Sequence, residues 1–314
     1  MHERGCSMAI VAAQSAPVQS RFLDLKALAS LSHLRFATRR QIEGAYSGRH
    51  RSRQKGGAGE FADYREYVEG EDLRRLDWKV LARTGRAYTK IFQDETNLLC
   101  TLAIDASGSM DFRGLAPQPG SKLEYVQYLC TALSHMIVTQ QDQVGVAVLA
   151  EGLQEAIPPA GTSLHLARLH ELIAGINTKP ATRLGDGLLD LFSRLTRRGV
   201  LLVLSDFLVD DLEEPFAALR LFRHRRWEVV VLHIVHPEEE RLPSALACRF
   251  EGLENDGRVD ASPAEVARLY EERFKEHVTA VRELALATGC EYHRVSTAIP
   301  YLQTLGSFLV ERTG

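Results

Sequence analysis

One stretch, residues 98–110, constrains the fold of this 314-residue chain more than any other. It begins with seven mostly apolar residues and then turns polar at Asp105, Ser107 and Ser109. A short apolar run that ends in a carboxylate and two hydroxyls predicts a buried strand leading into a loop. In parallel sheets, ligands bind beyond the carboxyl ends of the strands, so this loop is the first candidate for a site.

Short apolar runs alternate with longer amphipathic segments from residue 98 onward. The predicted strands cover residues 98–104, 144–149, 153–157, 200–205, 229–235 and 292–295, and the predicted helices cover residues 121–139, 164–176, 185–195, 212–224, 263–288 and 301–311. Strands separated by helical segments predict an α/β fold with a doubly wound, mostly parallel sheet over residues 98–314. We expect a small α+β subdomain over residues 19–97 and an unstructured tail over residues 1–18.

The first part of the chain differs from the rest in charge. Residues 1–97 hold 17 Lys and Arg against 12 Asp and Glu, whereas the remainder holds 21 against 29. Parts of opposite charge dock on each other or face different partners. We therefore expect the N-terminal subdomain to pack on the sheet. Its apolar spacing over residues 20–44 predicts an amphipathic helix or two.

Composition excludes several classes of protein. The chain is 45% apolar and 25% charged, which is typical of a soluble globular protein. Its five cysteines include no Cys-x-x-Cys pair, which argues against a disulfide framework and a zinc site. No apolar run approaches the roughly 18–20 residues of a membrane span. Residues 49–55 are strongly basic, but no aromatic residue interrupts them, so nucleic-acid binding is not expected. These features predict a cytoplasmic protein.

Two later residues can join the loop after residue 104. Thr182 precedes a predicted helix, and Asp206 directly follows a predicted strand. Together with Asp105, Ser107 and Ser109 they supply two carboxylates and three hydroxyls, which are hard oxygen ligands that suit Mg²⁺, with Mn²⁺ or Ca²⁺ as alternatives. Helix capping explains each of these residues singly, but it explains all five together poorly. A second threonine, Thr162, is an alternative to Thr182.

The order of these residues resembles a known site. The string Asp105-Ala-Ser107-Gly-Ser109, followed by Thr182 and Asp206, resembles the metal-ion-dependent adhesion site of von Willebrand factor A (VWA) domains. A second set of motifs resembles the family labelled domain of unknown function 58: Arg51-Ser52-Arg53, Gly59-Glu60-Phe61, Arg65-Glu66-Tyr67, Gly70-Glu71-Asp72, Arg74, Asp77-Trp78, Ala82-Arg83-Thr84, Lys122-Leu123-Glu124 and Ser205-Asp206-Phe207. The resemblance implies a VWA-like domain that holds a divalent ion. It also implies an adaptor that works with a MoxR-type AAA+ ATPase in chaperone-like assembly or metal insertion.

Three hypotheses about function follow. The first is a non-enzymatic binding module, in which a bound Mg²⁺ presents an open coordination position to an acidic residue of a partner protein. The second is a Mg²⁺-dependent phosphohydrolase that uses Asp105, although Ser107 stands where such enzymes have a second aspartate and no residue beside the serines suggests a general base. The third is a structural scaffold with a vestigial metal loop. We favour the first and expect no catalytic residue.

Overall fold

The computed structural model describes residues 20–38, 60–67, 76–93, 98–114, 120–242, 248–251, 258–261 and 263–313. The predicted tail over residues 1–18, the end of the predicted helical segment over residues 39–44 and the basic loop over residues 49–55 lie outside these residues. The motif residues Gly59, Gly70-Glu71-Asp72 and Arg74 lie outside them as well.

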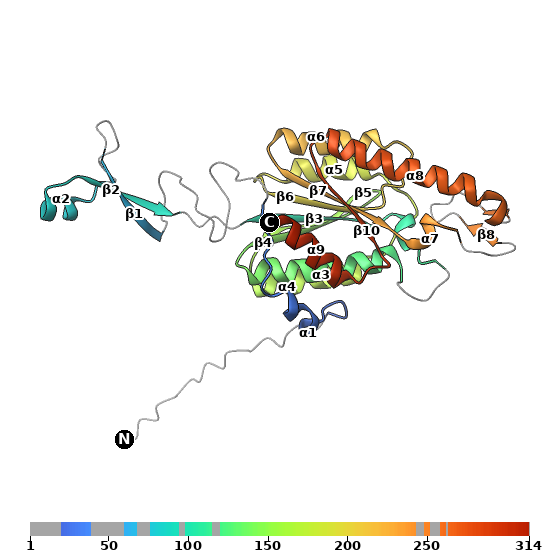
Figure 1. Ribbon diagram of the computed structural model, residues 1–314, viewed down its shortest axis with the longest axis horizontal. Coiled ribbons are helices and arrows are strands. Elements are labelled where there is room, and N and C mark those ends of the chain that lie inside the picture. The colour runs from blue at the N-terminus through green and yellow to red at the C-terminus, as the bar shows by residue number, and fades with distance from the viewer. Residues whose placement is uncertain are drawn as a thin grey trace, which may run out of the picture.

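A six-stranded sheet forms the centre of the structure (Figure 1). The strands lie in the order β10-β7-β6-β3-β4-β5, and all neighbours pair in parallel except β5, which runs antiparallel to β4 at one edge. Their bounds are β3 Leu99–Asp105, β4 Gln143–Ala150, β5 Gly152–Ala160, β6 Val200–Ser205, β7 Glu228–Val235 and β10 Glu291–Ser296. This topology confirms the predicted doubly wound, mostly parallel sheet.

Helices cover both faces of the sheet (Figure 1). One face carries α3 (Lys122–Thr139), α4 (Ser163–Gly175) and α9 (Tyr301–Thr313), and the other carries α5 (Leu184–Arg194), α6 (Glu213–His224) and α8 (Pro263–Ala287). Successive side chains of a strand point to opposite faces, so Leu102 and Ile104 join the core beneath α3 while Ala103 joins the core beneath α6. Because β3 is buried on both faces, its sequence is a nearly continuous apolar run rather than an alternating one.

Residues 20–38 pack against the α3 and α9 face. They contain only a four-residue helix, α1 (Leu25–Leu28), and a single 3-10 turn, so the longer helix predicted over residues 20–44 is wrong in its described part. Tertiary contacts replace helical hydrogen bonds here. The side chain of Gln140 accepts a hydrogen bond from Phe36 N at 3.0 Å and donates one to Leu34 O at 3.0 Å. Contacts with the end of α3 thus outweigh the helical pattern of the local sequence.

Two antiparallel pairs of strands lie outside the central sheet. β1 (Glu60–Glu66) pairs with β2 (Tyr88–Gln93), and between them α2 (Trp78–Thr84) begins at an Asp77 cap and ends at Gly85. A second pair, β8 (Cys248–Glu251) and β9 (Arg258–Ala261), precedes α8. The short helix α7 (Pro237–Glu240) follows β7 directly. The sequence predicted neither this second pair nor α7.

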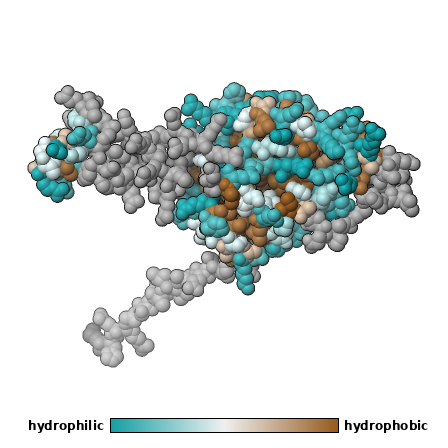
Figure 2. Space-filling view, viewed as in Figure 1, coloured by the Kyte–Doolittle hydropathy of each residue, from teal (hydrophilic) through white to brown (hydrophobic). Residues whose placement is uncertain are grey.

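The face of the molecule shown in Figure 2 is mostly polar, with apolar side chains gathered over α9 and β10. Ile299 and Val310 lie in this region and are 42% and 55% exposed. Partial exposure of single apolar side chains is ordinary in folded proteins and does not by itself mark an interface. Among the helices of the described residues, none is both long enough and apolar enough to cross a membrane.

Candidate metal site at the carboxyl edge of the sheet

The site lies where the chain direction across the sheet reverses. From β3 the chain continues to β4 and β5 on one side, whereas β6, β7 and β10 lie on the other side. Ligands in open α/β sheets bind beyond the carboxyl ends of the strands at this kind of switch point. Asp105 is the last residue of β3 and Asp206 directly follows β6, so the fold brings both carboxylates to this point.

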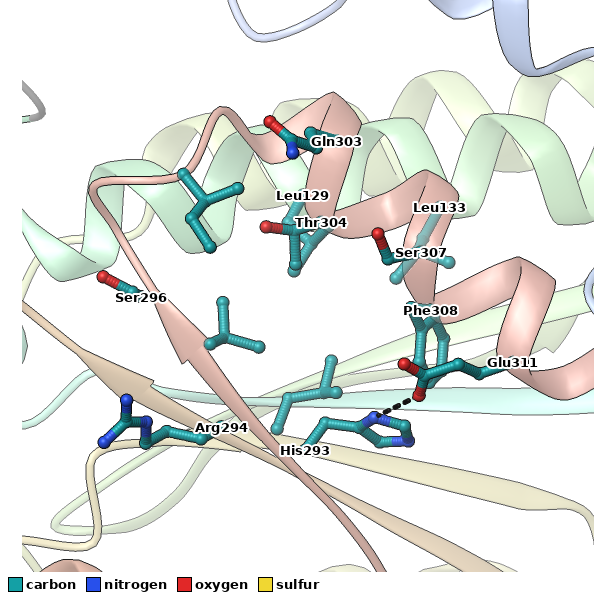
Figure 3. Close-up of a pocket in the computed structure, with 13 residues that line it drawn as sticks. Leu129, Leu133, His293, Arg294, Ser296, Gln303, Thr304, Ser307, Phe308 and Glu311 are labelled. Carbon is teal, nitrogen blue, oxygen red and sulfur yellow. Dashed lines mark ion pairs between the residues drawn. The ribbon is translucent and has the colours of Figure 1, made fainter.

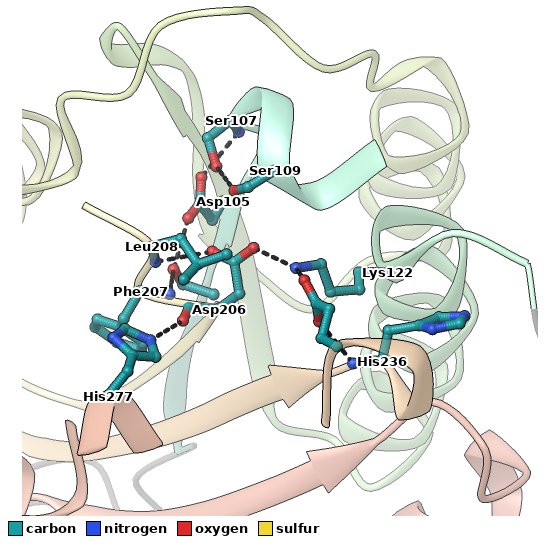
Figure 4. Close-up of polar contacts among 11 residues, drawn as sticks. Asp105, Ser107, Ser109, Lys122, Asp206, Phe207, Leu208, His236 and His277 are labelled. Carbon is teal, nitrogen blue, oxygen red and sulfur yellow. Dashed lines mark hydrogen bonds and ion pairs between the residues drawn. The ribbon is translucent and has the colours of Figure 1, made fainter. Parts of the chain in front are cut away.

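Asp105 is almost fully buried, and both of its carboxylate oxygens accept hydrogen bonds (Figure 4). Its Oδ1 accepts from Ser107 N at 2.9 Å, and its Oδ2 accepts from Ser205 Oγ at 2.5 Å. The Ser205 hydroxyl in turn accepts from Phe207 N at 2.8 Å. The loops that follow β3 and β6 are therefore joined through one serine hydroxyl.

Ser107 and Ser109 lie at the start of a 3-10 helix, Gly108–Asp111. Ser107 stands at the N-cap position, but its side chain makes no capping hydrogen bond, so the capping interpretation is wrong for this residue. Its hydroxyl lies 3.1 Å from that of Ser109, and the Ser109 hydroxyl also bonds the Asp206 carboxylate. Four of the five predicted residues, Asp105, Ser107, Ser109 and Asp206, thus form one connected polar cluster.

Two further groups hold the Asp206 carboxylate, in addition to the Ser109 hydroxyl. Its Oδ1 accepts from Leu208 N at 3.1 Å, and its Oδ2 lies 2.6 Å from the ammonium of Lys122. The same ammonium bonds Glu239, whose other oxygen accepts from His236 N at 2.9 Å. The helix after β6 begins at Leu212 without a side-chain cap, so Asp206 does not cap it as the alternative interpretation required.

The structure distinguishes the two threonines. Thr162 caps α4 by accepting a hydrogen bond from His165 N at 3.1 Å. Thr182 makes no capping bond to α5, and its hydroxyl is buried with no hydrogen-bond partner in the described part of the chain. Two backbone hydrogen bonds fix its loop: Lys179 N donates to Ala106 O, in the loop after β3, at 2.8 Å, and Arg183 N donates to Ala150 O, at the end of β4, at 2.7 Å. A direct contact of Thr182 with either carboxylate stays a prediction.

The two carboxylates share a strained electrostatic environment. Burial, followed by the neighbouring charge of Asp206, raises the pKa of Asp105 to about 6. Burial would also raise the pKa of Asp206, but the Lys122 ammonium holds that pKa below its ordinary value. The cluster therefore carries more negative charge than its own hydrogen bonds fully compensate, and a cation would relieve it.

The backbone is strained beside Asp206. Phe207 has a φ of 54°, which a bulky residue rarely adopts. Its ring is fully buried and stacks on Phe216 with centroids 5.4 Å apart. His277 of α8 donates a hydrogen bond to the carbonyl oxygen of Asp206 at 3.1 Å. Packing of this ring and the contact with α8 maintain a conformation that aims the Asp206 carboxylate toward Ser109.

These residues fit a hard divalent cation better than a soft one. In the described part of the chain, no group of three or more His, Cys, Asp or Glu side chains could hold a metal ion. Any ion here would depend on hydroxyl oxygens in addition to the two carboxylates, and oxygen-only donors suit Mg²⁺, Mn²⁺ or Ca²⁺. The unpartnered Thr182 hydroxyl is the observation that speaks most directly for a missing ligand.

Sequence reasoning missed several residues of this cluster. Ser205 bridges the two loops, and His277 donates a hydrogen bond to the carbonyl oxygen of Asp206. The Lys122 ammonium forms ion pairs with both Asp206 and Glu239. Lys122 and Ser205 appear in family motifs of the sequence, but nothing local marks them as buried. Glu239 stands within a run of three glutamates, and only the fold distinguishes it from its neighbours.

A separate cavity of about 160 Å³ lies between α9 and β10 (Figure 3). His293 lies in it between Glu311, at 3.3 Å, and Glu291, at 2.5 Å. The imidazole of His293 in this cavity is thus paired with two carboxylates. The cavity lies beside β10, two strands away from β6, so it is not part of the cluster around Asp105.

The doubly wound sheet with polar residues at its switch point defines an α/β protein with a VWA/Rossmann-like fold. The chain belongs to the family of proteins of unknown function DUF58, whose family model matches residues 63–282. This confirms the resemblance seen in the sequence motifs.

The chain is also similar to curated proteins and to solved structures. An uncharacterized protein of Mycobacterium tuberculosis, Rv1480, is 28% identical over 226 residues, which cover 70% of this chain and 68% of that protein. The crystal structure of the conserved hypothetical protein BatB from Bacteroides thetaiotaomicron matches with a TM-score of 0.47 at 19% identity, over 69% of this chain and 99% of that one. The SpRpn10 VWA domain matches with a TM-score of 0.39 at 12% identity, over 69% and 95%.

Proposed function

We propose that this protein is a non-enzymatic adaptor that binds a partner protein through a divalent ion, Mg²⁺ or else Mn²⁺ or Ca²⁺. Asp105, Ser107, Ser109, Thr182 and Asp206 would hold the ion. When bound, the ion would offer a coordination position to an acidic side chain of the partner. The protein's own residues orient the hydroxyls and keep the two carboxylates beside them.

The support for this proposal is the polar cluster of Asp105, Ser107, Ser109 and Asp206 at the switch point, together with the buried hydroxyl of Thr182, which has no hydrogen-bond partner among the described residues. Leu208, two residues after Asp206, is 37% exposed. An apolar side chain beside a polar centre is a common arrangement in protein interfaces. We propose that Leu208 lies in the surface that the partner contacts.

A phosphohydrolase finds less support in the geometry. A nucleophilic Asp105 would need an open approach for the substrate, but its side chain is almost fully buried, and Oδ1 and Oδ2 each accept a hydrogen bond. A carboxylate bonded in this way suits a role in holding an ion and its bound water. We therefore keep the adaptor as the proposed function, with a MoxR-type AAA+ ATPase or its client as the partner.

The first test is a calorimetric titration of Mg²⁺ into the metal-free protein. We expect saturable binding that Asp105→Ala abolishes, because this substitution removes one of the two carboxylates. Asp111→Ala is the matched control, since Asp111 belongs to the same 3-10 helix but points to solvent and pairs with Arg113. Equal binding by wild type and Asp105→Ala would contradict the proposed site.

The second test measures binding of the full chain to a purified MoxR-type ATPase. We expect Asp105→Ala to weaken this binding and Asp111→Ala to leave it unchanged. The comparison of variants is decisive because a chelator would also remove the magnesium that the ATPase needs for its own nucleotide. An unchanged affinity for Asp105→Ala would show that the partner binds elsewhere.

A further inference from the structure

A lysine ammonium lies inside the candidate site. Lys122 is the first residue of α3, and its side chain is fully buried. Its Nζ lies 2.6 Å from Asp206 Oδ2 and forms a second ion pair with Glu239 Oε1. Figure 4 shows the lysine reaching from α3 toward Asp206. Burial of an ammonium is unfavourable, so its position requires these carboxylates.

The charges of the cluster do not balance. Asp105, Asp206 and Glu239 are all buried, and among the residues that the structure describes Lys122 is the ammonium that faces two of them. Three carboxylates beside one ammonium leave an excess of two negative charges when all are ionised. This excess equals the charge of one divalent ion.

The ammonium is shared between two carboxylates with different roles. Asp206 is a predicted ligand of the ion, whereas Glu239 belongs to α7 and is fixed by the backbone of His236. A cation that bound Asp206 would compete with Lys122 for the same oxygen, and Glu239 would then remain as the partner of the lysine.

We propose that Lys122 is a resident cation of the site, which holds Asp206 in the ion-free protein and competes with a divalent ion for its carboxylate. Glu239 draws the ammonium away from Asp206 and so favours the ion. This inference rests on the proposed function, because it assigns these two residues to the regulation of the same site. Lys122 and Glu239 are positioning residues and need not touch the ion.

The test compares the thermal unfolding of full-length wild type, Lys122→Met and Glu239→Gln, first in chelator and then with increasing Mg²⁺. Loss of one unit charge beside a divalent ion changes its affinity by roughly tenfold or more, so we expect Lys122→Met to bind Mg²⁺ tighter by about that factor. Its melting temperature in chelator should fall below that of wild type, and Mg²⁺ should raise it by more. Glu239→Gln leaves the ammonium to Asp206 alone, so its Mg²⁺ response should be weaker than that of wild type.

Opposite changes in the two variants distinguish competition from a structural role. If Lys122 served only the stability of the fold, both substitutions would lower the melting temperature and neither would change the Mg²⁺ response. That result, or a weaker Mg²⁺ response in Lys122→Met, would overturn the inference. The double variant Lys122→Met/Glu239→Gln has the net charge of wild type but lacks the competing ammonium, so it should still bind Mg²⁺ more tightly than wild type does.

The inference can still be tested if Lys122→Met fails to fold in chelator. If Lys122→Met folds only after Mg²⁺ is added, the inference is supported. If Lys122→Met folds neither in chelator nor with Mg²⁺, the outcome depends on Glu239→Gln. A rise in the melting temperature of Glu239→Gln with Mg²⁺ that equals or exceeds that of wild type overturns the inference.

The same data separate this inference from the proposed function. A wild-type response that Lys122→Met does not exceed leaves the proposed function standing and overturns the role of Lys122. A response in Lys122→Met but not in wild type supports the competition and contradicts an ion-dependent function of the native protein. No response in either protein contradicts both.

Discussion

His233 of β7 is a buried histidine that the fold keeps neutral. Its Nδ1 lies 3.0 Å from the hydroxyl of Tyr292, and its ring packs edge-on against that of His277. Burial, followed by the nearby His277, lowers the pKa of His233 from 6.5 to about 3. The unfolded chain therefore binds a proton more readily than the folded protein as the pH falls.

This pKa shift predicts a loss of stability in acid. The contribution of neutral His233 is complete above pH 6.5 and is lost as the pH falls from 6.5 toward 3. Between pH 8 and pH 5 it should remove about 2 kcal/mol from the free energy of unfolding. His233→Gln should lack this component, so urea unfolding of the variant should show an acid loss smaller by about that amount. Parallel pH profiles of the two proteins would contradict the assignment.

At the scale of residues, the sequence predicted the parts of the site whose chemistry is local. Asp105, Ser107 and Ser109 are close in the chain, and Asp206 follows a recognisable strand. The capping interpretations failed because capping depends on hydrogen-bond geometry, which residue type alone does not determine. Lys122 could not be predicted as a buried charge, because its carboxylate partners lie 84 and 117 residues away.

The contact between β4 and β5 depends on one glycine. A Cβ atom on Gly145 would lie 2.5 Å from the carbonyl oxygen of Ile157, which belongs to β5. The pairing of the two strands shifts its register between Val144 and Val146, at this same place. Only a residue without a side chain lets the antiparallel edge strand approach β4 this closely.

Gly145→Ala should therefore displace β5 and lower the free energy of unfolding by about 1–3 kcal/mol, as overpacking of a core usually does. Gly175→Ala is the matched control. A Cβ at Gly175, the last residue of α4, meets nothing within 4 Å, so this substitution should be neutral within about 1 kcal/mol. Urea unfolding measures both, and equal stabilities would contradict the close approach.

At the scale of elements, prediction succeeded wherever burial determined the pattern. The central strands are apolar because both faces are covered, and the helices beside them repeat their apolar residues on one face. The prediction for residues 20–38 was wrong because tertiary contacts determine the conformation of this segment. Phe36 N donates a hydrogen bond to Gln140, and the ring of Phe22 contacts that of Tyr128 with centroids 4.8 Å apart. Such partners lie far away in the chain and leave no local signal.

Arg312 connects segments that are distant in the sequence, at the amino ends of strands β7 and β10. Its buried guanidinium donates to Ala37 O at 2.9 Å and to Glu291 at 2.8 Å, and it also bonds Glu228 at the start of β7. It lies 5.0 Å from the centroid of the Phe36 ring. One side chain therefore connects the N-terminal segment, two strands and the last helix.

Arg312→Met should lower the free energy of unfolding by about 3–5 kcal/mol, since it removes the buried partner of two carboxylates. Hydrogen exchange should also become faster at residues 34–37, whose backbone loses the contact at Ala37. Arg294→Met is the control. Arg294 pairs with Glu240 at 3.3 Å in a half-exposed position, so this change should cost less than about 1 kcal/mol. Unchanged exchange at residues 34–37 would show that other contacts hold the segment.

The contact between Arg312 and Ala37 has a consequence for synthesis of the protein. The two residues are 275 positions apart, so Ala37 leaves the ribosome long before its partner exists. At about 5–20 residues per second, the N-terminal segment waits roughly 15 to 55 seconds before this contact can form. The sheet strands β3 to β10 are all made within that interval. Docking of residues 20–38 can therefore be completed only as a late event in the biogenesis of the molecule, after the sheet that receives it.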